Sequence, residues 1–464
     1  MYRLVKTIII LLFVFLTPIG VFGQEFSISS IAIEGNDKTK EQYILRELVF
    51  GVGDTISLEK WDEKKKRSIQ NLINTALFHS ANISLKRERG NYCKVIIQVV
   101  ERWYLWPIPQ VEIDERNFNT WWETKSLSRA SAGVFLTHNN MRGRGEMLKV
   151  LLMLGYNKQL GLSYEFPYLN KKKTFGFGFE SIYTLRHEVN ALTDSNRQVY
   201  LKTPDSPIQR DLINAIQFTY RPKYYVSHLL QLRYRKYVFA DTLINFNSCY
   251  SSQQNSELQY FGFYYKFKLD HRDYKPYPLS GYYADMEVFK YGMGIFHNDL
   301  NVLRFKTTLR KYWQYSRRWF SAIGLIAQVS NHHFQPYLIE RGLGYGRDFV
   351  RAYEYYVIDG QDYIVFKSNL KFSLLPKRFY KLSIIKSDKF NNIPISIYMN
   401  MFADAGYVNN NQNYNVSNTL PNTFLYSGGL GVDFVSYYDA VARVEWSVNA
   451  LGESHLYLHF IAPI

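Results

Sequence analysis

The sequence predicts a transmembrane antiparallel β-barrel preceded by one small α+β domain. The 464 residues are 17% aromatic and include 39 tyrosines but only 14 prolines, a composition that favours strands. From residue 131 onward, apolar and polar residues alternate in segments long enough to cross a bilayer when tilted. The mean hydropathy of -0.26 is expected when outward apolar and inward polar residues average out.

The first 23 residues have the pattern of an export signal. Arg3 and Lys6 precede an apolar run from Ile8 to Leu16, and small residues at Val21 and Gly23 precede Gln24. The run is too short to span a bilayer, and no cysteine follows the cleavage position to accept a lipid. We therefore expect residues 1–23 to be a cleaved signal peptide.

Residues 24–102 predict a small domain with the element order β-α-α-β-β. An alternating strand runs over 26–34, and Thr39 followed by Gln42 has the pattern of a capping box for a short helix. Ser57 is placed to cap a second helix whose apolar residues recur at helical spacing.

Two further strands, 81–86 and 93–100, close this domain. The basic run at 64–67 is assigned to a solvated helix face, with a lipid or partner surface as the alternative. Residues 103–130 are expected to be a linker. Its aromatic and proline-rich start, 103–109, suits a rigid connector at a membrane interface, and a packed linker without membrane contact is the alternative.

Residues 131–464 predict about sixteen strands, an even number as in single-chain bacterial barrels. In lipid, a sheet can pair all of its backbone groups only by closing on itself, so we expect a barrel; a soluble β-sandwich is the alternative. The least regular strand is 198–203, without which the number falls to about fourteen. The predicted strands are 132–137, 147–154, 160–166, 174–184, 198–203, 212–220, 228–240, 258–269, 282–291, 300–313, 320–330, 362–373, 395–407, 424–434, 440–448 and 455–461.

The sequence does not indicate an enzyme or a nucleic-acid-binding protein. The formal charge of +16 is spread through aromatic strands without a recognition motif. Cys93 and Cys249 lie far apart and predict neither a disulfide framework nor a metal site. His187-Glu188 lacks the second histidine of a zinc-protease helix, and the glycines of 342–346 do not join a strand to a helix. We therefore predict no catalytic, cofactor-binding or metal-binding residue.

One long segment, about 331–361, lacks the alternation found on both sides of it, and loops of this length are usually functional. Within it, Val350-Arg351-Ala352-Tyr353 resembles the Val/Ile-Arg-Gly-Phe/Tyr loop motif of the BamA/TamA family of outer-membrane assembly factors. Further along, Phe402-Ala-Asp404-Ala-Gly406 resembles the strand motif that this family sets against the loop.

Other stretches carry the same resemblance. Asp270-His-Arg272-Asp273, followed by Pro278 and Gly281, matches the family's D-x-R-D-x-x-x-x-P-x-x-G turn at every fixed position. Its charged groups can brace a tight turn, in which proline fixes the backbone and glycine frees it. The 139–145 loop and the glycine-rich 427–434 strand are also similar to family motifs, and the 24–102 domain resembles a POTRA (polypeptide-transport-associated) domain.

The resemblance implies that Arg351 folds back into the lumen to meet Asp404, on an inward-facing row shared with Phe402 and Gly406. A guanidinium held by a carboxylate can form two parallel hydrogen bonds, and a glycine leaves room for close packing. Two unrelated solvated charges are the alternative. Ala352 stands where the family has glycine, so the turn must be made by a residue that resists positive φ.

For function, the resemblance implies a Gram-negative outer-membrane protein that assists the insertion or translocation of polypeptides, with its N-terminal domain in the periplasm. Its partners would be outer-membrane lipids, client polypeptides, and periplasmic or lipoprotein accessory subunits. Strand addition at a sheet edge supplies a physical basis for handling clients. A passive pore and a structural or surface-interaction barrel are the alternatives.

Overall fold

The structure is a computed structural model. It describes residues 25–113, 130–170, 172–203, 205–251, 254–296, 300–331, 335–381, 392–411, 417–436 and 440–460. The predicted signal peptide, 1–23, lies outside the described residues.

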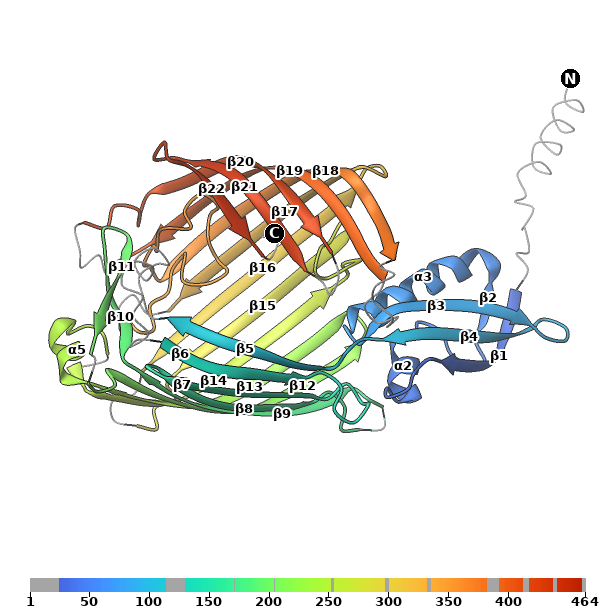
Figure 1. Cartoon of the computed structure of the whole chain (residues 1–464), viewed down its shortest axis with the longest axis horizontal. Coiled ribbons are helices and arrows are strands. Elements are labelled where there is room, and N and C mark those ends of the chain that lie inside the picture. The colour runs from blue at the N-terminus through green and yellow to red at the C-terminus, as the bar shows by residue number, and fades with distance from the viewer. Residues whose placement is uncertain are drawn as a thin grey trace, which may run out of the picture.

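The N-terminal domain packs two helices on a four-stranded sheet (Figure 1). Its sheet has the order β2-β1-β4-β3, in which β1 and β4 are parallel. A short strand, β2, was not predicted, because three residues are too few to display an alternating pattern. The elements are β1 (Glu25–Glu34), α2 (Glu41–Glu47), β2 (Thr55–Ser57), α3 (Leu58–Asn74), β3 (Phe78–Arg87) and β4 (Tyr92–Glu101).

Thr39 was wrongly predicted as a cap, because Lys40 is the N-cap residue of α2. Ser57 is the N-cap residue of α3 as predicted, but it makes no side-chain capping hydrogen bond. The hydroxyl of Thr39 lies 3.0 Å from the hydroxyl of Tyr104 and accepts a hydrogen bond of 2.9 Å from Asn140 Nδ2. Thr39 therefore makes hydrogen bonds where the small domain meets the barrel, and a local sequence pattern cannot reveal such a contact.

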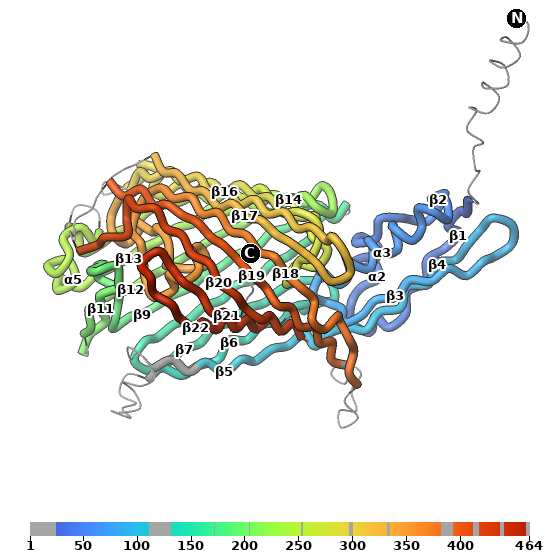
Figure 2. Tube along the Cα trace, turned by 90° about the horizontal axis from the view of Figure 1, so that it is seen from above, coloured from blue at the N-terminus to red at the C-terminus, as the bar shows by residue number. Residues whose placement is uncertain are grey.

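Sixteen antiparallel strands form the second domain, inclined to its long axis (Figure 2). In order they are β5 (Leu105–Ile113), β6 (Ala130–His138), β7 (Met147–Gly155), β8 (Lys158–Phe166), β9 (Phe175–Arg186), β12 (Gln209–Lys223), β13 (Val226–Phe239), β14 (Glu257–Asp270), β15 (Gly281–Tyr291), β16 (Val302–Gln314), β17 (Trp319–Ser330), β18 (Asp362–Lys381), β19 (Asn392–Asn409), β20 (Phe424–Val435), β21 (Val441–Asn449) and β22 (Ser454–His459).

The predicted number of barrel strands is right, but only because two errors offset each other: one barrel strand was missed, and one strand outside the barrel was counted in it. Strand β5 lies within the predicted linker 103–130 and pairs with β6. Its Pro107 and Pro109 hide it from a strand pattern, yet proline is tolerated because β5 is at the edge of the sheet. The predicted barrel strand 198–203 is instead β11 (Arg197–Lys202), which pairs with β10 (Glu188–Asp194) in a separate hairpin.

Side chains alternate along the strands as the fold class requires. On β18, Ile364 and Phe366 point outward and are 48% and 44% exposed, whereas Lys367 and Asn369 point inward and are buried. The outer surface is therefore apolar and the lumen polar, as expected for a barrel surrounded by lipid. No helix in the described part of the chain, the short α5 (Asp241–Phe246) included, is long and apolar enough to cross a membrane.

Candidate functional site

The segment between β17 and β18 folds back inside the barrel. Its described part, 335–361, forms an isolated bridge between Leu343 and Ile358 and packs an apolar cluster against the barrel wall. Val350 and Tyr353 belong to this cluster and are 1% and 2% exposed. We call 335–361 the luminal loop.

Arg351 and Asp404 lie in direct contact inside the barrel, at the wall formed by β18 and β19, and both side chains are fully buried. Arg351 Nε donates to Asp404 Oδ2 at 2.7 Å, and Nη2 donates to Oδ1, so the contact is bidentate. Nη1 donates to Asn369 Oδ1 at 2.7 Å and Nη2 to the Ser368 carbonyl at 3.1 Å. The guanidinium also lies 3.8 Å from the ring centroid of Phe402. The loop is thus tied to β18 and β19 by one side chain.

The turn that presents Arg351 is tight and strained. Ala352 has φ of +69°, a conformation that costs a residue with a Cβ roughly 1–2 kcal/mol. Its carbonyl accepts hydrogen bonds from Asn449 Nδ2 at 3.0 Å and from the Tyr457 hydroxyl at 3.4 Å. Opposite the turn, a Cβ on Gly406 would lie 2.6 Å from Val350 Cγ2, so glycine is needed for the close approach.

A second buried ion pair lies beside the first and was missed from the sequence. Arg443 on β21 and Asp433 on β20 are both 0% exposed, and Nη2 of the arginine donates to Oδ2 at 2.7 Å. Tyr277 and Asn400 each donate a 2.7 Å hydrogen bond to the same carboxylate. Asp433 lies in the glycine-rich 427–434 strand, which was the available signal. Arg443 is its direct partner on the next strand, whereas Tyr277 and Asn400 come from distant parts of the chain.

The 270–281 turn lies at the end of the barrel that contacts the N-terminal domain, where Asn74 Nδ2 donates to the Asp273 carbonyl at 3.2 Å. Arg272 makes two 2.8 Å hydrogen bonds to Asp270, and Asp273 Oδ1 accepts from the backbone N–H groups of residues 279 and 280. Gly281 has φ of +103°, and a Cβ there would lie 2.1 Å from the His271 carbonyl oxygen. Tyr277, next to Pro278, packs among buried luminal residues. The turn therefore reaches from the rim to the Arg443–Asp433 pair.

The N-terminal domain is docked on this rim. Glu47, which is 1% exposed, accepts hydrogen bonds of 2.8 and 2.9 Å from the guanidinium of Arg221 in β12. Arg46 lies 3.8 Å over the ring of Tyr168, and burial lowers the pKa of Arg46 to about 10. The backbone N–H of Lys40 donates to the carbonyl of Gly143 at 2.8 Å. The 139–145 motif is thus a docking surface for the small domain.

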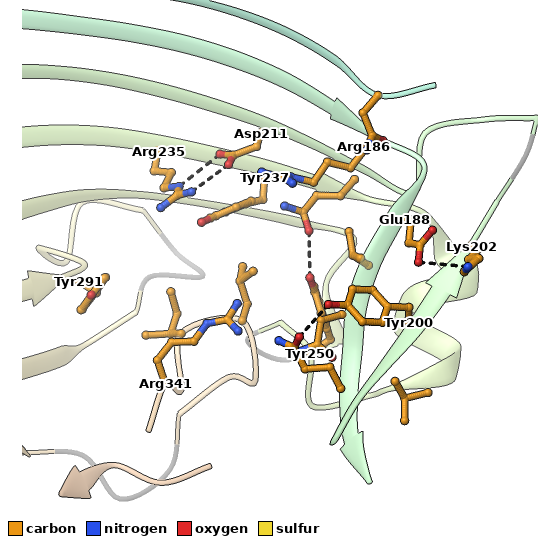
Figure 3. A pocket seen from close by; sticks show the side chains of 18 of the residues that line it. Arg186, Glu188, Tyr200, Lys202, Asp211, Arg235, Tyr237, Tyr250, Tyr291 and Arg341 are labelled. Atoms are coloured by element: carbon orange, nitrogen blue, oxygen red, sulfur yellow. Dashed lines mark hydrogen bonds and ion pairs between the residues drawn. The ribbon is translucent and has the colours of Figure 1, made fainter. Parts of the chain in front are cut away.

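The β10–β11 hairpin lies at the end of the barrel away from the N-terminal domain (Figure 1). Together with the luminal loop it encloses a cavity of about 1020 Å³ (Figure 3). Five cationic side chains and two carboxylates line it, including the Arg235–Asp211 pair with hydrogen bonds of 3.2 and 2.9 Å. The hairpin tip is anchored, because the Asn196 carbonyl accepts a 2.9 Å hydrogen bond from the N–H of Val357. The hairpin and loop together cover this mouth of the barrel.

Comparison with known proteins agrees with this architecture. Residues 26–102 match the POTRA family described as a surface antigen variable number repeat. CdiB from Escherichia coli is 11% identical with a TM-score of 0.53, covering 95% of this chain and 75% of that one. CdiB from Acinetobacter baumannii is 11% identical with a TM-score of 0.50, covering 94% and 73%. BamA from Haemophilus ducreyi lacking POTRA domains 1-3 is 15% identical with a TM-score of 0.49, covering 93% and 83%. No curated protein sequence matches the chain.

The chain is therefore a POTRA-domain protein with a sixteen-stranded barrel. The POTRA match confirms the predicted N-terminal domain, and the two CdiB structures share the fold of the chain.

Proposed function

We propose that this protein resides in the outer membrane, with its POTRA domain in the periplasm, and assists the insertion or translocation of polypeptides. One observation carries this proposal. Every neighbouring pair of strands in the barrel sheet is hydrogen-bonded, but among the described residues no ladder joins the first strand, β5, to the last, β22. An unpaired edge is a template on which another strand can add.

The two edges of this seam are both weak pairing surfaces. β5 carries two prolines, which cannot donate to a ladder, and β22 has only six residues. On β22 the outward side chains Leu456 and Leu458 are 67% and 59% exposed, as expected for a strand next to lipid. A seam that is costly to close and easy to open would let a client strand pair transiently with the barrel.

The luminal loop is positioned to influence the seam. Ala352 and Tyr353 in the loop bond to Asn449, Tyr457 and the N–H of Ala450, which lie on or between the last two strands. Because the same loop is held by Asp404, a movement of the loop would be transmitted to β22. This coupling needs no covalent chemistry or nucleotide.

The POTRA sheet offers a second edge. Its order places β3, a ten-residue strand, at the side away from the short β2. A periplasmic client in extended conformation could add there before reaching the barrel. Accessory periplasmic or lipoprotein subunits are further candidates for this edge.

The buried lumen disfavours a passive pore. Side chains lining an open aqueous channel would be solvated, yet Arg351, Asp404, Asp433, Arg443 and Glu445 are at most 3% exposed. The luminal loop and the 270–281 turn fill this side of the barrel. Solute passage would first require their displacement.

Depletion of the protein followed by quantitative outer-membrane proteomics tests the proposal. We expect specific barrel or secreted proteins to decline and to recover with the full-length chain but not with a chain lacking 24–102. The protein itself should fractionate with the outer membrane and show heat-modifiable gel mobility. An unchanged proteome, or rescue without the POTRA domain, would contradict the proposal and favour a structural or surface-interaction barrel.

A further inference from the structure

We infer that Glu354, Glu445 and His459 form a binding site for one divalent transition-metal ion. The three residues come from the luminal loop, β21 and β22 respectively. One potential ligand atom from each lies within 4.8 Å of the others. The site lies at the luminal side of the seam, where the structure joins its loop to its last strands.

Among the described residues, none of the potential ligand atoms has a hydrogen-bonding partner. Glu445 is 0% exposed, and neither of its carboxylate oxygens accepts a hydrogen bond from the described residues. The same holds for both oxygens of Glu354 and for Nε2 of His459. Buried polar atoms are nearly always hydrogen-bonded, because leaving one unsatisfied is energetically costly. Three side chains with unsatisfied polar atoms, one atom from each within 4.8 Å of the others, point to a ligand that would bind all three.

The neighbouring guanidinium groups do not supply that partner. Arg351 is engaged bidentately with Asp404, and Arg443 with Asp433. Their Nη1 atoms lie 3.8 and 3.6 Å from Glu445 Oε2, beyond hydrogen-bonding distance. Each guanidinium thus hydrogen-bonds its own carboxylate and reaches Glu445 only as a longer ion pair, so the carboxylate oxygens of Glu354 and Glu445 accept no hydrogen bond from the described residues.

The donor set selects the class of ion. One imidazole nitrogen and two carboxylates suit zinc, iron(II) or manganese, whereas calcium and magnesium prefer oxygen ligands alone. His459 Nε2 lies 3.3 Å from Glu354 Oε1. Two ligands of a tetrahedral zinc ion are about 3.4 Å apart, because each bond is about 2.1 Å long. A small movement of Glu445 would complete three protein ligands and leave a position for water.

The bound ion would act as a cross-link. Glu354 follows Arg351 by three positions in the loop, and His459 is the last residue of β22. The imidazole also stacks on Phe349 of the loop, with ring centroids 6.0 Å apart. Coordination would therefore fix the loop to the strand that borders the seam. This inference concerns metal binding and does not depend on the proposed function.

Metal analysis of the full-length protein in detergent micelles tests the site. The protein is loaded with zinc chloride, desalted and measured by mass spectrometry for zinc per chain. We expect about one zinc ion in the wild-type chain and a loss of at least about 80% of it in Glu354→Gln and in His459→Ala, as removal of one of three ligands predicts. Zinc should also slow proteolysis of the wild-type loop.

His455→Ala is the matched control. His455 lies on the same strand and face but makes an edge-to-face contact with Tyr355, with ring centroids 5.3 Å apart. This variant should keep its zinc. Binding of no zinc by the wild-type chain, zinc retained by both Glu354→Gln and His459→Ala, or equal loss in His455→Ala would each overturn the site. Glu354→Gln changes only the loop, so heat-modifiable mobility verifies that its barrel is intact. Absence of zinc would assign the 3.3 Å contact to a protonated histidine–carboxylate pair.

Discussion

Arg351 and Asp404 form a bidentate, fully buried ion pair that joins the luminal loop to the barrel wall. They are separated by 53 positions in the chain, and the arginine carries hydrogen bonds to β18 as well. A buried pair of this kind adds little stability relative to apolar residues, but removal of one partner leaves an uncompensated charge. The pair therefore sets the position of the loop more than it stabilises the fold.

Arg351→Ala should release the loop and cost about 3–5 kcal/mol of stability, because Asp404 would stay buried without a partner. Arg351→Lys should rescue only in part, since lysine cannot form the bidentate contact. Limited proteolysis of the loop and client assembly measure the effect. Arg347→Ala, an exposed arginine in the same loop, is the control. Wild-type protease resistance of Arg351→Ala would show that the loop is held by its apolar cluster alone.

Ala352→Gly should stabilise the loop by up to about 1 kcal/mol, because glycine adopts the observed φ of +69° without steric cost. The greater freedom of glycine in the unfolded chain offsets part of this gain. A higher temperature for loss of heat-modifiable mobility, or slower loop proteolysis, would be the readout. Ala405→Gly, in the middle of β19, should instead destabilise the protein, because glycine weakens a strand interior. Destabilisation by both substitutions would contradict the strain at Ala352.

Arg221→Ala should detach the POTRA domain from the barrel rim without unfolding either domain. Glu47 is 1% exposed, and its carboxylate accepts two hydrogen bonds from this arginine across the interface. Broader distance distributions between spin labels on the two domains would report the detachment. Glu63→Gln on the exposed face of α3 should leave them unchanged. A distribution identical to wild type in Arg221→Ala would mean that the 139–145 contacts suffice for docking.

The luminal loop should be held less firmly as the pH rises. Burial, with a smaller contribution from Asp359, raises the pKa of Glu340 to about 8, and Gln361 Nε2 lies 2.7 Å from its carboxyl oxygen. The folded protein therefore binds more protons than the unfolded chain between the ordinary glutamate pKa of 4.5 and about 8. The stabilising effect of the neutral group is present at low pH and is lost progressively through this window.

Loop proteolysis measured from about pH 6 to about pH 9 checks whether the loop is held less firmly as the pH rises. Wild-type protein should become more sensitive towards the alkaline end, whereas Glu340→Gln, which cannot ionise, should show a flatter profile. A wild-type profile that is flat, or an unchanged slope in Glu340→Gln, would assign the carboxyl an ordinary pKa.

The sequence alone determined the features that depend on local patterns. Alternation of apolar and polar residues along single strands predicted the barrel, because the two faces of each strand meet lipid and lumen. The resemblance of the motifs at 350–353 and 402–406 to family motifs singled out Arg351 and Asp404. Each signal is contained within a few consecutive residues, so it is visible without knowledge of the fold.

The tertiary structure decided which distant residues meet. β5 became a barrel strand because β6 offers it a partner, although its own prolines argue against a ladder. The β10–β11 hairpin left the barrel because its two strands pair with each other. Glu354, Glu445 and His459 are unremarkable in the sequence, since 105 positions separate the first from the last and only barrel curvature and loop insertion bring them within 4.8 Å. Such convergence depends on how the strands and the luminal loop are arranged in space, which no single stretch of residues encodes.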